Sequence, residues 1–284
     1  MSAVQRLVDF WRGIYESPDP VRRIQELEEN YPQELIDEAE TPHFLYPEPF
    51  YGPLEEDMSN DLLVLLMNPG AVREVDNYSS KINQNVVERY KSWRRSDFLQ
   101  ECGCVDTKWI PIPRTSSICK ESCPLHGIHA NGCGWRRTRY REAKFDVGLS
   151  FEFLHTMEYI PYHSKWYREM DSVRGWMNRA TATNLSFDAV YEIATERKVK
   201  HIVSLGAAWI DILSSRGFQP EEDIQIRNSD GNVLGRLLKY QLTADALPIV
   251  IHLYPRAVRL PSDPKVVNEM RRMLGLPPKV DKPE

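Results

Sequence analysis

The apolar run from Leu62 to Met67 is the feature that most constrains how this chain can fold. It reads Leu-Leu-Val-Leu-Leu-Met and leads directly into Asn68-Pro69-Gly70. An apolar run of this length without alternation is typical of a central parallel strand that is covered on both faces. Ligand sites in open parallel sheets lie at the carboxyl ends of the strands. The sequence therefore predicts an α/β fold in which Asn68 stands at a ligand-binding edge.

Three more segments have the character of strands in the same sheet. One begins at Leu247 and stops at His252, with Pro255 and Arg256 just beyond it. Another covers 201–206 and leads into Ala207-Ala208-Trp209, and a strand is also expected over 155–159. We expect Asn68 and His252 to lie in one cleft, at the ends of neighbouring parallel strands.

Helical periodicity and turn signals organise the rest of the chain. Residues 1–40 have a helical pattern broken by Pro18 and Pro20, and residues 42–53 have the composition of an extended connector. The tight-turn sequence Ser229-Asp230-Gly231-Asn232 predicts a β-hairpin over 224–242. Further helices are expected over 83–99, 172–181, 187–196 and 264–274.

Composition favours an enzyme of the cytoplasm. The chain has 284 residues, 42% of them hydrophobic and 27% charged, which is enough for a large core. Its apolar runs are too short for a membrane span, and Asp9 interrupts the amino-terminal apolar residues, so neither a membrane partner nor a signal peptide is expected. No obligate protein partner is evident. The net charge of −5 does not exclude DNA, because local patches decide electrostatic binding.

All five cysteines fall within 32 residues, together with His126 and His129. A short-spaced set of this kind suits one structural zinc better than disulfides in an intracellular chain. The ligands we predict are Cys119, Cys123, Cys133 and His126, with His129 as an alternative to His126; Cys102 and Cys104 offer further thiols. An iron–sulfur cluster and ordinary thiols are the competing interpretations. No redox cofactor is implied.

An arginine-rich segment follows the last cysteine. It reads Trp-Arg-Arg-Thr-Arg-Tyr-Arg and places four arginines within six residues, between aromatic side chains. Arginines suit phosphate contacts and aromatic rings suit base stacking. The alternative is a solvated helix face. We predict DNA contacts for Arg136, Arg137, Arg139 and Arg141.

These short motifs resemble the uracil-DNA glycosylase superfamily. Met67-Asn68-Pro69-Gly70 looks like the water-positioning motif of its single-strand-selective and mismatch-specific branches. The stretch from His252 to Arg256 looks like the family's His-Pro-Ser-Pro loop, with Leu253 and Tyr254 in place of Pro-Ser. The resemblance implies a three-layer α/β/α domain with a central, mainly parallel four-stranded sheet. That domain would span 1–284, with a helical extension over 1–55 and a Cys/Arg-rich insertion over 100–145.

The resemblance also implies roles for individual residues. Asn68 would hold the attacking water, and His252 would donate a hydrogen bond to the base O2 as negative charge grows there. The expected base pocket consists of Met67, Gly70, Ala71, Tyr78, Glu158 and His163. Lys165 and Arg256 are expected to contact DNA, Arg256 either as a wedge or on a phosphate.

Glu158 carries the information on the substrate. It stands three residues before Pro161, where the family has an asparagine that reads the uracil edge. An ionised carboxylate only accepts hydrogen bonds, so it repels uracil O4 and accepts from the amino group of cytosine. In another register Glu158 is a cap or an ion-pair residue.

Together with Glu158, the resemblance implies a DNA glycosylase that flips out and hydrolytically excises a modified cytosine, such as glucosylated hydroxymethylcytosine of phage DNA, in antiviral defence. The partner is DNA and the product an abasic site. Repair of uracil or of mismatches is one alternative. A zinc-stabilised nucleic-acid-binding module without catalysis is an alternative of another class.

Overall fold

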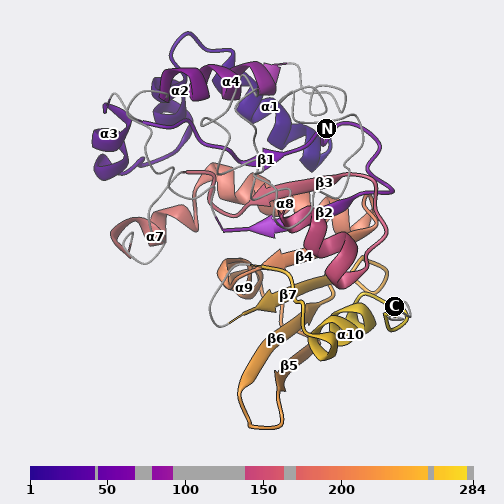
Figure 1. The fold of residues 1–284 in the computed structure, drawn as a ribbon. Coiled ribbons are helices and arrows are strands. Elements are labelled where there is room, and N and C mark those ends of the chain that lie inside the picture. The colour runs from indigo at the N-terminus through magenta and orange to yellow at the C-terminus, as the bar shows by residue number, and fades with distance from the viewer. Residues whose placement is uncertain (42–43, 68–78, 92–137, 163–170, 255–258, 280–284) are drawn as a thin grey trace, which may run out of the picture.

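In the part of the chain that the structure describes, seven strands form one mixed sheet, in the order β1-β3-β2-β4-β7-β6-β5 (Figure 1). The structure is a computed structural model, and it describes residues 1–41, 44–67, 79–91, 138–162, 171–254 and 259–279. The α/β class predicted from the sequence is confirmed. The prediction of a four-stranded sheet is wrong, because strands that pair antiparallel extend the sheet on both sides.

The four central strands are parallel to one another. They are β3 (Leu154–Glu158), β2 (Leu62–Leu66), β4 (His201–Leu205) and β7 (Ile249–Leu253), in that order. Every residue of β2, β3 and β4 is buried. Helices and loops cover both faces of these strands, which explains why their sequences are apolar without alternation.

The antiparallel strands lie at the two sides of this parallel centre. Strand β1 (Phe50–Tyr51) pairs with β3. The sequence does not predict it, because two residues inside a proline-rich connector are too few to show the alternation of a strand. Strands β5 (Glu222–Arg227) and β6 (Val233–Tyr240) form the predicted hairpin, and β6 pairs with β7. Figure 1 shows the hairpin projecting at the end of the sheet away from the amino-terminal helices.

The first face of the sheet carries Leu63, Leu65 and Met157 and packs against most of the helices. These helices are α1 (Ala3–Tyr15), α2 (Pro20–Leu27), α3 (Gln33–Ala39), α4 (Ser79–Lys91), α7 (Asp171–Met177), α8 (Thr181–Thr195) and α9 (Ala208–Ser215). Buried side chains of α1 recur at helical spacing, from Val4 to Tyr15, so the amino-terminal helices belong to this core.

The second face carries Leu62, Val64 and Leu66 and is covered by fewer elements. These are the π-helix η1 (Glu142–Val147) and α10 (Pro264–Met273). Figure 1 shows α10 beside β5 and β6, near the carboxyl terminus. Helix α10 begins where the sequence predicts, with Asp263 as its cap and Pro264 in its first turn.

A buried carboxylate joins the amino-terminal helices to the body of the fold. Glu28 is 1% exposed, and its carboxylate accepts hydrogen bonds from the N–H groups of Thr181 (2.6 Å) and Ala182 (2.9 Å) and from the Tyr162 hydroxyl (3.1 Å). Thr181 and Ala182 open α8, which has no side-chain cap of its own. Glu28 therefore caps a helix that starts 153 residues later, which is why the predicted start at 187 was six residues late.

Candidate functional site

The order of the parallel strands points to one place in the sheet. The chain runs from β2 to β3 on one side and then returns to β4 on the other side of β2. Such a reversal is a topological switch point, and ligands in α/β sheets bind beyond the carboxyl ends of the strands that flank it. Here the flanking strands are β2 and β4. The segment Asn68-Pro69-Gly70 follows the end of β2, although these residues lie outside the described part of the structure.

Hydrogen bonds hold the carboxyl ends of these strands together. The carbonyl oxygen of Leu66, the last residue of β2, accepts from the Tyr159 N–H and from the Trp209 indole N–H, each at 2.8 Å. The Met67 carbonyl accepts from the Ile160 N–H at 2.8 Å. Trp209 is 1% exposed and lies in the first turn of α9. Its hydrogen bond to Leu66 therefore ties α9, which follows β4, to the carboxyl end of β2. Sequence analysis did not assign it a role.

Glu158 closes β3 at this edge. It is the register partner of Leu66, and its side chain is 6% exposed. Its N–H donates to the Pro49 carbonyl at 2.8 Å, which fixes the backbone from the β1 side. Residues in parallel register share a face, so Glu158 lies on the second face with Leu66. Glu158 is therefore a buried acidic residue at the carboxyl end of β3, and its role in reading a base stays a prediction.

His252 lies in the same row of the sheet, on β7. It pairs with Leu205 of β4, the strand that separates β2 from β7. The expectation that Asn68 and His252 follow neighbouring strands is therefore wrong by one strand, because the fourth parallel strand adds beside the third. Glu158 and His252 are three strand spacings apart, about 14 Å at the backbone. Both stand at the carboxyl edge.

The His252 ring is almost fully buried, at 1% exposed, and its two nitrogens have different surroundings. Nδ1 lies 2.8 Å from the Arg259 carbonyl oxygen, which can only accept, so Nδ1 carries a proton. Nε2 is buried without a hydrogen-bond partner and faces Gly235 of β6. Burial lowers the pKa of His252 to about 4, with a smaller contribution from the charge of Arg259. The ring is therefore neutral at pH 7, with Nε2 unprotonated.

Two arginines and one glutamate surround the return of the chain from the β7 loop. Arg139 is 8% exposed and forms an ion pair with Glu142 at 3.0 Å. The Glu142 carboxylate also accepts from the Leu260 N–H at 3.0 Å, so η1 anchors this return. Burial lowers the pKa of Arg139 and raises that of Glu142, and Arg259 adds to the positive potential at both groups.

No protein-family model, curated protein or solved structure matches this chain. No helix in the described ranges is long and apolar enough to cross a membrane.

The predicted site residues divide into those that the structure describes and those outside it. Met67, Arg139, Arg141, Glu158 and His252 are described. Arg139 is buried against Glu142 rather than open to a phosphate, and Arg141 is half-buried with an Nε that has no hydrogen-bond partner. Outside the described residues lie Asn68, Gly70, Ala71, Tyr78, Arg136, Arg137, His163, Lys165 and Arg256.

The predicted zinc ligands Cys119, Cys123, His126 and Cys133 also lie outside the described residues, so the zinc prediction stays open. Within the described ranges, no group of three or more His, Cys, Asp or Glu side chains is placed to hold a metal ion.

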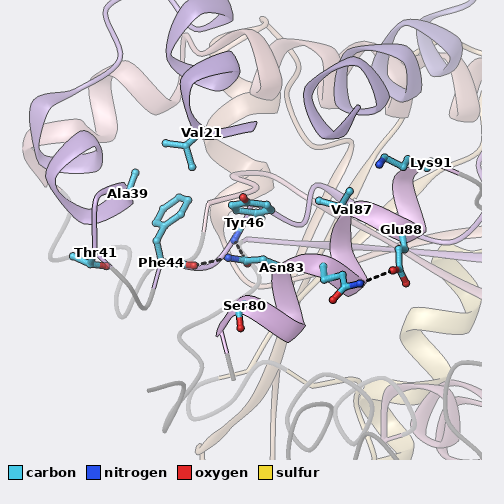
Figure 2. A pocket seen from close by; sticks show the side chains of 11 residues that line it. Val21, Ala39, Thr41, Phe44, Tyr46, Ser80, Asn83, Val87, Glu88 and Lys91 are labelled. Carbon is cyan, nitrogen blue, oxygen red and sulfur yellow. Dashed lines mark hydrogen bonds between the residues drawn. The ribbon is translucent and has the colours of Figure 1, made fainter. Parts of the chain in front are cut away.

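A separate cavity of about 590 Å³ lies between the amino-terminal helices and α4, and Figure 2 shows the side chains that line it. Asn83 of α4 points at the connector: its Oδ1 accepts from the Tyr46 N–H and its Nδ2 donates to the Phe44 carbonyl, each at 2.8 Å. The amide of Asn83 is thus occupied by the protein's own backbone. None of the predicted site residues lines this cavity.

Proposed function

We propose that this protein is a DNA glycosylase of the uracil-DNA glycosylase type that excises a modified cytosine. The observation that carries the proposal is the arrangement of the carboxyl edge. Glu158 and His252 occupy one row on one face of four parallel strands, and between them lies β2, the strand that Asn68 follows in the sequence. The four parallel strands, with helices on both faces, also support the three-layer fold that the resemblance implies.

The reaction divides among three residues. Asn68 positions the attacking water on the sugar, which develops oxocarbenium character as the N-glycosidic bond breaks. Glu158 accepts from the N4 amino group of a flipped cytosine. His252 stabilises the leaving base at O2. Because Nδ1 already donates to the Arg259 carbonyl and the buried Nε2 faces Gly235, this last role needs a second proton on the ring and a turn of the ring towards the base. The negative charge of the bound DNA and of the departing base favours that proton.

Discrimination against uracil follows from the burial of Glu158. At 6% exposure the carboxylate has little water to shield it from a facing carbonyl. A mismatched pair of buried acceptors costs about 1–3 kcal/mol or more. A selective target is required, since release of ordinary cytosine would damage the host genome. These considerations favour a modified cytosine and antiviral defence over uracil repair.

The test is a strand-cleavage assay for abasic sites on matched oligonucleotides. These carry uracil, cytosine, 5-hydroxymethylcytosine or its glucosylated form at one position. The proposal expects release from a modified cytosine, with little from uracil. Preferential release of uracil would favour repair, and no release from any oligonucleotide would favour the binding module. Asn60→Ala is the matched control for Asn68→Ala, because Asn60 is exposed and precedes β2 at the opposite edge.

A further inference from the structure

Arg259 lies where the chain returns from the β7 loop, and within the described part of the chain it has no acidic partner. Its guanidinium carbon lies 4.3 Å from the centroid of the Tyr254 ring. Its Nε is buried and has no hydrogen-bond partner. Among the described residues, no carboxylate lies within ion-pair distance of it. Two arginines near the edge strand β5 differ from Arg259 in this respect. Arg236 and Arg272 each form an ion pair with a carboxylate of β5.

The nearest groups leave the charge of Arg259 uncompensated. Burial raises the pKa of Glu142, and the charge of Arg259 opposes that rise. The Glu142 carboxylate itself is bound by the Arg139 guanidinium and the Leu260 N–H, each at 3.0 Å. His252 is neutral, and its Nδ1–H donates to the backbone carbonyl of Arg259 rather than contacting the guanidinium. A half-buried guanidinium whose buried Nε–H lacks an acceptor is costly to leave unpaired.

We propose that Arg259 and Tyr254 form a binding site for one phosphodiester group of DNA, next to the base pocket. An arginine whose flat face rests on an aromatic ring keeps its N–H edge available for two parallel hydrogen bonds to a phosphate. A phosphodiester carries one negative charge, which matches the single positive charge of the Arg259 guanidinium. The identity of the ligand as DNA rests on the proposed function, whereas the affinity for phosphate does not.

Duplex binding at several salt concentrations tests the site without requiring catalysis. The probe is an unmodified duplex followed by fluorescence anisotropy. Arg259→Gln should weaken binding about tenfold and reduce the slope of log Kd against log salt by about 0.9, the value for one lost phosphate contact. Arg272→Gln is the matched control, because the Arg272 guanidinium is exposed and engaged by Glu222 and Glu269. It should leave the slope unchanged.

A second measurement separates a phosphate site from a loss of folding. In protein labelled with ¹⁵N-arginine, the Nε–H resonance of Arg259 should shift on addition of the duplex. Inorganic phosphate should shift it only at much higher concentration, and Tyr254→Phe, which keeps the ring, should preserve the response. A larger response to inorganic phosphate than to the duplex would identify a site for free phosphate and overturn the proposal.

The outcomes distinguish this inference from the glycosylase proposal. If no oligonucleotide releases a base but Arg259→Gln lowers the salt slope, the glycosylase proposal fails and the phosphodiester site stands. If a base is released and Arg259→Gln binds like the wild type, the site is wrong and the glycosylase stands. A wild-type protein that binds no duplex would overturn the phosphodiester site.

Discussion

His155 at the amino edge of the parallel sheet and His252 at its carboxyl edge are both buried, but their ring nitrogens have different partners. At the amino edge, His155 and Asp61 are both fully buried, and Nε2 lies 2.8 Å from the carboxylate. The other oxygen of Asp61 accepts from the Phe153 N–H at 3.0 Å. At the carboxyl edge, His252 meets only a backbone carbonyl, and its Nε2 has no partner.

The polarity of parallel strands gives the two ends of the sheet different tasks. The loops beyond their carboxyl ends converge on one crevice and supply ligand contacts, whereas the amino ends only have to be closed. A buried acid beside a histidine is often taken as a sign of catalysis. In this protein we interpret the Asp61–His155 pair as a closure of the amino edge and assign the chemistry to the other edge.

The largest expected effect is on turnover at the carboxyl edge. Asn68→Ala should lower the single-turnover rate of base release by roughly 10²–10³-fold, because an aligned group at the reaction centre is lost. DNA binding and unfolding free energy should change little. The Asn60→Ala control should keep wild-type turnover. Equal rates for Asn68→Ala and the wild type would remove Asn68 from the mechanism.

At the amino edge, the expected effect is on stability. Asp61→Ala leaves His155 and the Phe153 N–H without this acceptor, so the free energy of unfolding should fall by about 3–5 kcal/mol. Urea unfolding measures this, with Asp188→Ala as the control, since its ion pair with Arg6 is exposed and should cost under about 1 kcal/mol. Loss of turnover per folded molecule in Asp61→Ala would reverse our assignment of the edges.

The pH dependence of stability probes His252. Its pKa is about 4 in the folded protein against an ordinary 6.5, so between these values the unfolded state binds a proton that the folded state does not. Stability should therefore fall as the pH drops from 6.5 to 4, by up to about 3 kcal/mol from this residue. Urea unfolding from pH 7 to pH 4.5 should show that His252→Gln lacks this part of the loss. If the unfolding free energy of the wild type and of His252→Gln fell equally with pH, the assigned contribution of His252 would be contradicted.

The smallest expected effect comes from the residue that His252 faces. A Cβ on Gly235 would lie 3.0 Å from His252 Nε2 and 3.2 Å from Val266 Cγ1. Gly235→Ala should therefore cost about 1–3 kcal/mol of stability and displace the ring. In Gly13→Ala the new Cβ meets nothing within 4 Å and lies in helix α1, so that control should gain roughly 0.5–1 kcal/mol. An unchanged melting temperature in Gly235→Ala would show that the His252 ring can move aside at no cost in stability and would contradict this prediction.

Much of the fold could be predicted because burial is encoded in apolar pattern. The run from Leu62 to Leu66 and the helical segment that starts at Pro264 are local signals, and both were found in the structure. Helix α9 was missed because Ala207 provides no side-chain cap. The cap that Glu28 provides to α8 depends on chain segments far apart in sequence, so no local pattern reveals it.

The candidate site could be predicted less completely, for a related reason. The positions of Glu158 and His252 follow from where their strands end, and sequence reveals those ends. The hydrogen-bond partner of His252 could not be predicted in this way, because it is a backbone carbonyl, which every residue type has. Arg139 was predicted to contact DNA, yet Glu142 stands three residues away on the same helical face and pairs with it. That spacing is readable and would have indicated the ion pair.

The substrate preference of Glu158→Asn tests the central claim most directly. Asparagine restores an amide that can donate to uracil O4 and accept from N3–H, at a position that is buried beside the end of β2. Base release should be measured on uracil and modified-cytosine oligonucleotides, with Glu196→Asn as the exposed control. We predict that Glu158→Asn loses release of the modified cytosine, by about tenfold or more, and gains release of uracil. An unchanged preference would contradict the assignment of Glu158 as the base-reading residue.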